Sequence, residues 1–129
     1  MDDEGEIREL HARWFAAGAR KDLDALMAPI AADVVSYEHV APLEYVGIDA
    51  VREVCRQGLE ASDNTVTWEV PDLRVVVDGD LAVGWGLNRI RVPRPDGSTT
   101  EYRSRGTRVF RRTGGEWKLV HQHLSFPQG

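Results

Sequence analysis

Apolar residues in the N-terminal half of the chain recur at the spacing of a helix. The steps of three and four are made by Ile7, Leu10, Trp14, Phe15 and Ala17. Acidic residues at positions 2–4 favour the positive end of such a helix. The pattern predicts a first helix ending near Gly18, a short second helix over 23–27 and a third over about 50–59.

Beyond residue 64 the pattern changes to β-branched residues that alternate with polar ones. Turn dipeptides interrupt it at Asp78-Gly79, Asp96-Gly97 and Gly114-Gly115. These breaks predict strands over about 65–77, 80–92, 99–112 and 116–126, joined as hairpins, after an earlier strand over 34–39. Helices followed by an antiparallel meander indicate an α+β fold, here a single domain spanning 1–129 with a concave pocket at the open end of the sheet.

Side chains alternate between the two faces of a strand, so the faces can be assigned to the pocket or to the outside. In 80–92 we expect the bulkier face to point inward, and this face consists of Leu81, Val83, Trp85, Leu87 and Arg89. In 99–112 the face with fewer charges carries Arg108 and Phe110. In 116–126 the more apolar face consists of Val120, Gln122, Leu124 and Phe126, which leaves Trp117, Leu119, His121 and His123 on the other.

This assignment places two arginines, Arg89 and Arg108, on the inner side of neighbouring strands. An inward guanidinium needs a partner, because an unpaired charge in a low-dielectric cavity is costly. The nearest acid by topology is Glu38. The three residues therefore form either a buried structural ion-pair network or a polar patch that receives an anionic or carbonyl-bearing ligand.

Composition narrows the function further. The 129 residues are 42% hydrophobic and 29% charged, with a net charge of −5, which argues against nucleic acid or an anionic membrane as the partner. The acidic start MDDEGEIRELH lacks the apolar core of a secretory signal, and no apolar run reaches transmembrane length, so we expect a cytoplasmic protein. The lone Cys55 lies on the apolar face of the third predicted helix and is expected to be a small buried hydrophobe.

Histidines offer little sign of a metal site. His121 and His123 have acceptable ligand spacing, but no third ligand stands near them and both are expected to face away from the pocket. We expect His11 on the first helix to face solvent. Neither a metal nor a cofactor is expected.

Two groups of segments carry a resemblance to a known family. The closing hairpin, TRVFRR at 107–112, EWK at 116–118 and VHQHLS at 120–125, resembles that of SnoaL-like proteins and especially the association domain of calcium/calmodulin-dependent protein kinase II. KDLD at 21–24 and ADVV at 32–35 resemble the helix-to-strand passage of ketosteroid isomerases and SnoaL-like cyclases. The chain is thus similar to the nuclear transport factor 2-like superfamily over nearly its whole length.

The resemblance implies a cone of three N-terminal helices packed on a strongly bent antiparallel sheet, one pocket per subunit and a homodimer through the outer sheet face. It also implies that Arg89 and Arg108 match two pocket arginines of the association domain, while Leu124 and Val51 replace a third arginine and a histidine. Glu38 falls where ketosteroid isomerases have their general-base aspartate. Trp14 replaces an oxyanion-hole tyrosine, so steroid isomerisation itself is not expected.

These observations lead to two functional hypotheses. The first is a cofactor-independent acid–base enzyme acting on a small hydrophobic or anionic molecule with a carbonyl or epoxide, by isomerisation, cyclisation or hydration. Glu38 would be its base, and Arg89 and Arg108 would hold the oxyanion. The second is a non-catalytic ligand-binding or assembly module of the same fold. In either case the expected pocket lining is Trp14, Tyr37, Val51, Leu59, Trp85, Leu87, Val120, Gln122, Leu124 and Phe126.

Overall fold

The computed structural model describes residues 1–61 and 65–129; residues 62–64, where the sequence predicts the change from helix to strand, lie outside the described residues. The helices are α1 (Asp3–Ala19), α2 (Leu23–Met27) and α3 (Ile48–Glu60). Asp2 caps α1 by accepting a hydrogen bond from the amide of Gly5 at 2.8 Å, and Asp22 caps α2 by accepting one from the amide of Ala25 at 3.1 Å. No helix in the described ranges is both long enough and apolar enough to cross a membrane.

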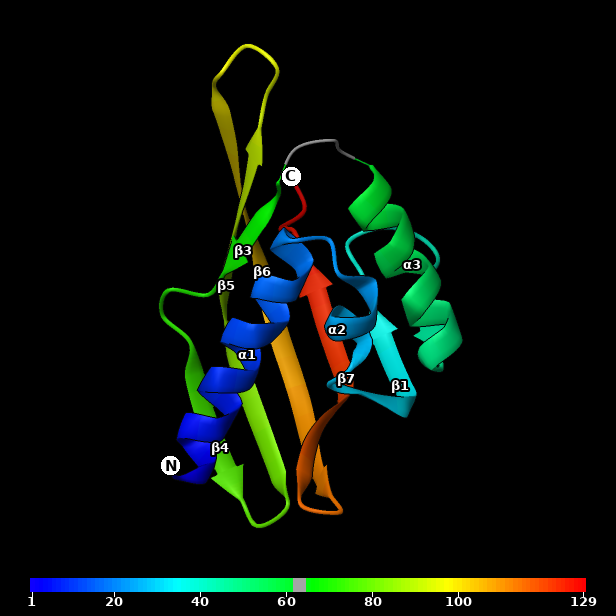
Figure 1. Ribbon diagram of the computed structural model, residues 1–129, viewed down its shortest axis with the longest axis vertical. Coiled ribbons are helices and arrows are strands. Elements are labelled where there is room, and N and C mark those ends of the chain that lie inside the picture. Colours follow the sequence, from blue (N-terminus) through cyan, green and yellow to red (C-terminus); the bar gives the residue numbers. More distant parts are fainter. Residues whose placement is uncertain (62–64) are drawn as a thin grey trace.

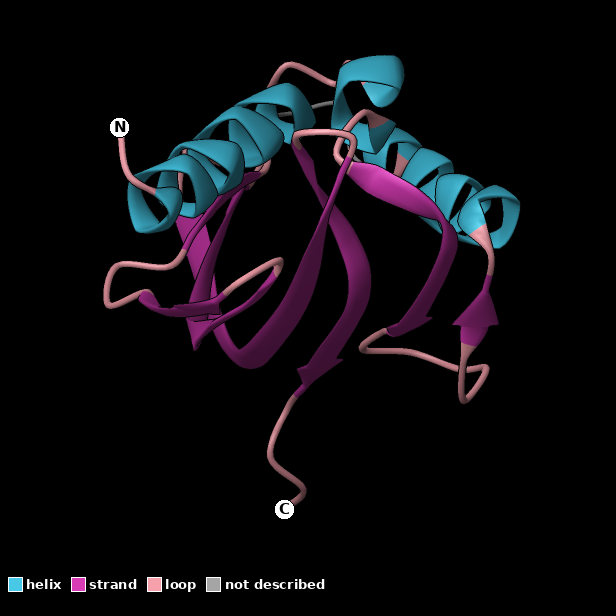
Figure 2. Ribbon diagram, turned by 90° about the horizontal axis from the view of Figure 1, so that it is seen from below, coloured by secondary structure: helices cyan, strands magenta, loops and turns pink. Residues whose placement is uncertain are grey.

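One curved sheet carries the strands, and the helices cover its concave side (Figures 1 and 2). Its strands are β1 (Ile30–Tyr37), β2 (Tyr45–Val46), β3 (Thr67–Glu69), β4 (Arg74–Asp78), β5 (Leu81–Pro93), β6 (Thr99–Thr113) and β7 (Glu116–Ser125). The order is β2-β1-β7-β6-β5-β3, with β4 also paired to β5. The α+β class and the helix-covered bent sheet are confirmed. The sheet is mixed, because β1 pairs with β7 in parallel and the other pairs are antiparallel.

The apolar core lies between the helices and the inner face of the sheet. From the helices it takes Ile7, Leu10, Trp14 and Val51, and from the strands it takes Val34, Phe110 and Leu119, among other buried residues. Phe110 on β6 and Leu119 on β7 are register partners and are fully buried. The core therefore fixes how α1 crosses the long strands, and with it the side chains that α1 presents to them.

The face assignment for β5 is wrong. Trp85 and Leu87 are 38% and 54% exposed on the outer face, while the inner face carries small residues and Asn88. The reason is close approach of the chain segments that cover this strand. A Cβ built on Gly86 would lie 2.5 Å from Cγ1 of Val70, and one built on Gly84 would lie 3.2 Å from Cε1 of His11. Bulky side chains cannot fit there, so they point outward.

The predicted strand over 65–77 is two strands. The segment between β3 and β4 contains Pro71 and forms a turn in which the amide of Leu73 donates to the carbonyl of Val70 at 3.2 Å. Proline has no amide hydrogen with which to continue a ladder, so the strand breaks there. The turn places Val70 over Gly86 of β5.

On β7 a register shift brings residues from both of the faces predicted for this strand to the inner side. Phe110 pairs with Leu119 and its neighbour Val109 pairs with His121, which leaves Val120 as the extra residue of a bulge. Trp117 and Leu119 before the bulge are buried, and so are Gln122 and Leu124 after it. The inward direction expected for Gln122 and Leu124 is confirmed, whereas Trp117 and Leu119 were wrongly assigned to the outside.

Candidate functional site

A row of residues across the inner face of the sheet contains the candidate site. Ser36 of β1 pairs with Gln122 of β7, Gln122 pairs with Arg108 of β6, and Arg108 pairs with Gly84 of β5. Ser36, Gln122 and Arg108 are all buried. The register thus aligns a hydroxyl, an amide and a guanidinium beneath the helices, as the inward direction predicted for Arg108 requires.

Arg108 is a buried cation with few partners. The residue is 1% exposed, and its guanidinium carbon lies 5.4 Å and 5.3 Å from the ring centroids of Trp14 and Phe15. Its Nη2 donates to Oδ1 of Asn88 at 3.1 Å, but Nε and Nη1 have no hydrogen-bond partner. Burial lowers the pKa of Arg108 to about 10, against the opposing effect of the Glu38 charge. The side chain therefore stays charged at neutral pH.

Asn88 is held in place from a second side. Its Nδ2 donates to the hydroxyl of Ser104, its register partner on β6, at 3.0 Å. Gly106 lies between the two contacts, and a Cβ there would be 2.8 Å from both amide atoms of Asn88 and 3.0 Å from Nη1 of Arg108. The glycine gives the arginine room to reach the amide. The guanidinium is thereby fixed in orientation while two of its nitrogens stay available.

Glu38 follows β1 and is half-buried. One carboxylate oxygen, Oε2, accepts a hydrogen bond from the hydroxyl of Ser36 and another from Nε2 of Gln122 at 3.0 Å. Within residues 1–61 and 65–129, no ion pair joins Glu38 to an arginine. The carboxylate is close enough to act on Arg108 by its charge, yet it does not neutralise the guanidinium by direct contact.

His11 belongs to the same interior and is not a solvent-facing residue as expected. It is 3% exposed, and Nδ1 lies 2.8 Å from the carbonyl oxygen of Ile7 while Nε2 has no hydrogen-bond partner. Burial lowers its pKa to about 4, with Arg108 adding to the effect against the hydrogen bond to Ile7. Its spacing of four residues from Ile7, in phase with Trp14, is the sequence signal that could have indicated burial.

A second histidine, His39, was not singled out from the sequence. Its ring centroid lies 5.9 Å from that of Trp68 and 4.5 Å from that of Phe126, and its buried Nε2 has no partner. Burial, and next the charge of Arg108, lower its pKa. Its position directly after Glu38, at the end of the predicted strand, is the only sequence feature that could have suggested that His39 lies near the site.

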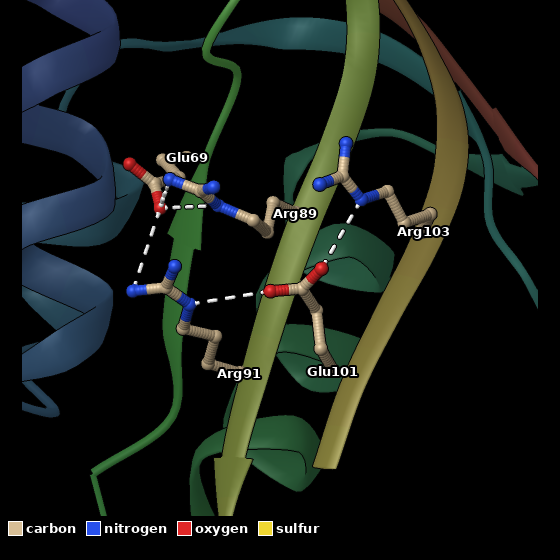
Figure 3. Close-up of polar contacts among 5 residues, drawn as sticks. All are labelled: Glu69, Arg89, Arg91, Glu101 and Arg103. Carbon is tan, nitrogen blue, oxygen red and sulfur yellow. Dashed lines mark hydrogen bonds and ion pairs between the residues drawn. The ribbon is translucent and has the colours of Figure 1, made fainter. Parts of the chain in front are cut away.

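Arg89 belongs to a cluster of charged residues that does not include the site (the cluster is drawn in Figure 3). Its Nε donates to Oε1 of Glu69 at 2.6 Å, and the cluster continues on the outer face through Arg91, Glu101 and Arg103. The Arg91–Glu101 and Arg103–Glu101 distances are 3.4 Å and 3.2 Å. Arg89 shares the outward parity of Trp85, so the error in the face of β5 carried it to the wrong side. Of the two predicted arginines, only Arg108 is inside.

The remaining expected lining residues divide between the two sides. On the inner side Trp14, Val51, Gln122 and Leu124 are buried. Leu59 on α3 is half-buried, and so is Val120 in the bulge of β7. Phe126 is partly exposed but its ring contacts His39.

Tyr37 is wrongly placed, because its ring lies against His121 and His123, with centroids 4.8 Å and 5.5 Å away. Both histidines are on β7, and His123 is the register partner of Tyr37. In the described part of the chain, no group of three or more histidine, cysteine or acidic residues could hold a metal ion.

A groove of about 410 Å³ opens between α1 and the segment from β3 to β4. Its lining includes His11, Ala12, Phe15 and Ala16 of α1 and, opposite them, Trp68. Phe15 also contacts the guanidinium of Arg108. The groove is therefore bounded by residues that also contact or adjoin the buried polar group.

Comparisons with known proteins agree with this architecture. An NTF2-like protein of unknown function from Pseudomonas putida is 30% identical, with a TM-score of 0.88 and coverage of 100% of this chain and 91% of that one. A candidate dehydratase of the same family from Streptomyces avermitilis is 22% identical, with a TM-score of 0.86 and coverage of 98% of both chains. A candidate calcium/calmodulin-dependent protein kinase II association domain from Xanthomonas campestris is 20% identical, with a TM-score of 0.84 and coverage of 100% and 91%.

No curated protein sequence matches the chain. The family model described as the SnoaL-like domain matches residues 7–129, which include α1 with His11, the strand leading to Glu38 and the closing hairpin with Arg108. The chain belongs to the SnoaL-like domain family, within the nuclear transport factor 2-like superfamily.

Proposed function

We propose that this chain is a small acid–base enzyme that holds a carbonyl or carboxylate oxygen of an organic molecule against Arg108 and moves a proton with Glu38. The observation that carries the proposal is the unpaired state of Arg108. A buried cation with two unpartnered nitrogens costs folding free energy that a structural ion pair would offset by direct contact. A bound oxygen atom would supply the missing contact.

The chemistry follows from the positions of the two charges. Glu38 takes a proton from the carbon beside the carbonyl, and the electron pair moves to the carbonyl oxygen, where Arg108 stabilises the negative charge. A fixed cation in apolar surroundings is effective because it does not have to reorganise as charge develops. Return of the proton to another carbon completes an isomerisation. Attack of the carbanion on a second carbonyl carbon, followed by transfer of the proton from Glu38 to the new alkoxide oxygen, completes a cyclisation. The hydrogen bonds from Ser36 and Gln122 orient Glu38 for the transfer.

A non-catalytic binding module is the second candidate, and the same two hydrogen bonds favour it. A carboxylate that accepts from Ser36 and Gln122 can serve to close the pocket without taking part in chemistry. This candidate needs Arg108 but no proton transfer. The two functions therefore differ in the role of Glu38 alone.

Binding is tested first, with a panel of small carboxylates measured by calorimetry against wild type, Arg108→Met and Arg111→Met. Arg111 lies on the same strand, exposed on the outer face, and serves as the matched control. We expect Arg108→Met to abolish binding and Arg111→Met to retain it. We also expect the unliganded Arg108→Met variant to be at least as stable as wild type, because an unpaired buried charge is removed. Unchanged binding by Arg108→Met would disprove both candidate functions.

Catalysis is tested by hydrogen–deuterium exchange at the carbon beside the carbonyl of a bound ketone or acid, followed by proton NMR in D₂O. Glu38→Gln should slow exchange on the order of 100-fold or more, since a positioned base contributes at least that much. Glu44→Gln, which changes an exposed glutamate near the end of β1, should exchange at the wild-type rate. Binding without exchange in the wild type would favour the non-catalytic module.

A further inference from the structure

The ring of His11 has a fixed tautomer. Nδ1 lies 2.8 Å from the carbonyl oxygen of Ile7, and a carbonyl can only accept, so Nδ1 carries the hydrogen. A neutral imidazole has one donor and one acceptor nitrogen. Nε2 of His11 is therefore an acceptor with a free lone pair.

That lone pair is buried without a partner. Nε2 has no hydrogen bond, and the ring is enclosed by Trp14, Phe15 and Phe110, whose centroids lie 6.3, 5.9 and 5.3 Å away. Buried polar atoms in folded proteins nearly always have a partner, and an exception calls for an explanation. Trp14 and Phe15 also contact the guanidinium of Arg108, so the free acceptor and the free donors share the same aromatic walls.

The direction of the lone pair follows from its contact with the sheet. A Cβ on Gly84 would be 3.2 Å from Cε1 and 3.5 Å from Nε2 of His11, so this edge of the ring faces the inner side of β5. Gly84 is the register partner of Arg108. The acceptor is thus aimed at the row of the sheet that also carries the unpaired cation.

We propose that Nε2 of His11 accepts a hydrogen bond from a hydroxyl group of the molecule that Arg108 holds, which makes the substrate class a small hydroxylated carbonyl compound or carboxylic acid. The inference rests on the proposed function of the Arg108 site. A second carboxylate cannot donate to Nε2, and a cationic group is disfavoured by the charge of Arg108. A neutral hydroxyl can donate a hydrogen bond to Nε2 and carries no positive charge. The groove beside Phe15 and Trp68 offers apolar surface for the rest of the molecule.

Burial and the neighbouring Arg108 also keep this histidine neutral, because they lower its pKa to about 4. The ring therefore acts as an acceptor over the whole physiological pH range. It orients the hydroxyl as a neutral acceptor.

The test uses benzoate and its 2-, 3- and 4-hydroxy derivatives as probes, with affinities measured by calorimetry. We expect at least one hydroxy isomer to bind wild type about 10-fold more tightly than benzoate, which is the effect of one hydrogen bond to a buried partner. In His11→Phe the ratio of hydroxybenzoate affinity to benzoate affinity should fall to less than 2-fold. His11→Gln, which retains an acceptor, should restore part of it and guards against a folding defect in the first variant.

Three outcomes separate the inference from the proposed function. If no hydroxy isomer is preferred, or the preference survives in His11→Phe, the hydroxyl contact is wrong while loss of benzoate binding in Arg108→Met still supports the site. If benzoate binding is absent or is insensitive to Arg108→Met, the proposed function fails and the inference with it. Independently of any probe, long-range proton–nitrogen NMR at pH 7 should show Nε2 without a hydrogen, and a protonated Nε2 would overturn the inference directly.

Discussion

Arg108 and Asn88 are joined by a hydrogen bond that passes over a residue without a side chain. Nη2 of Arg108 donates to Oδ1 of Asn88 at 3.1 Å, and Gly106 lies beneath the contact. The requirement for glycine here is steric and not conformational, because the neighbouring amide and guanidinium occupy the space that a Cβ would take. The orientation of the Arg108 guanidinium thus depends on Gly106, although this residue has no side chain with which to contact it.

Gly106→Ala should therefore disturb the site. The new Cβ would lie 2.8 Å from the amide of Asn88, so either that side chain or the strand must shift. We expect a loss of about 1–3 kcal/mol in the free energy of unfolding, measured by urea denaturation, and weaker carboxylate binding. Gly58→Ala is the matched control, because nothing lies within 4 Å of its Cβ position and its helical backbone accepts alanine. It should be neutral or stabilising by about 0.4–1 kcal/mol.

His11 should make the protein less stable in mild acid. Its ordinary pKa of 6.5 applies to the unfolded chain and its folded pKa is about 4, so the unfolded state binds more protons between these values. The stabilising contribution is complete above pH 6.5 and is lost as the pH falls toward 4. A pKa shift of this size corresponds to a loss on the order of 3 kcal/mol in the free energy of unfolding.

The measurement compares urea denaturation at pH 7, 6, 5 and 4 for wild type and His11→Phe. The difference between the two should shrink or reverse on acidification, because the variant has no ring to protonate, whereas carboxylates contribute equally to both. His123→Phe removes an exposed histidine and should follow the wild-type curve. Parallel curves for wild type and His11→Phe would contradict the burial of a neutral ring.

Much of the fold could be predicted because it depends on periodicity and turn chemistry, which are local. The hairpin turns follow from the dipeptides at 78–79, 96–97 and 114–115, and Gly79 adopts the positive φ of 62° that such a turn requires. The parallel pairing of β1 with β7 joins segments more than eighty residues apart and has no local signal. The split between β3 and β4 did have one, in Pro71, which a longer strand could not accommodate.

Arg108 lies on the predicted side of the sheet because the face of its strand was assigned correctly. The inward direction of Arg108 was predicted because its face carries few charges. Glu38 was chosen as the nearest acid by topology, and the resemblance then aligned it with a general base. Arg89 was misplaced because large side chains were taken as the sign of an inner face. On β5 the opposite holds, since His11 and Val70 pack directly onto glycines. Only the three-dimensional approach of α1 and of Val70 to β5 reveals that requirement.

Cys55 should be chemically inert in the folded protein. Burial raises the pKa of its thiol to about 12, with the charge of Glu38 acting in the same direction. The thiolate is the reactive form, so its fraction at pH 8 is far below that of a free cysteine. We expect negligible alkylation by iodoacetamide at pH 8 over an hour, by mass spectrometry, and complete alkylation in urea. Rapid labelling of the folded chain would show that the α3 face opens readily.

A second copy of this chain is the partner we expect on the outer sheet face. Large apolar side chains on this side of β4 and β5 are exposed to between 38% and 55%, and they are Val76, Leu81, Trp85 and Leu87. The register makes them one continuous strip, since Val76 pairs with Val83 and the adjacent rows carry Trp85 and Leu87. Contiguous exposed apolar surface of this kind usually marks an interaction site.

The prediction is tested by the oligomeric state. Sedimentation equilibrium should give a dimer for wild type and a monomer for Leu87→Glu, because the new carboxylate would be desolvated within an apolar contact. Leu43→Glu changes a loop residue that is 95% exposed and should stay dimeric. The candidate site lies on the opposite face of the sheet, so carboxylate binding should persist in the monomer. A wild type that stays monomeric at high concentration would contradict this prediction.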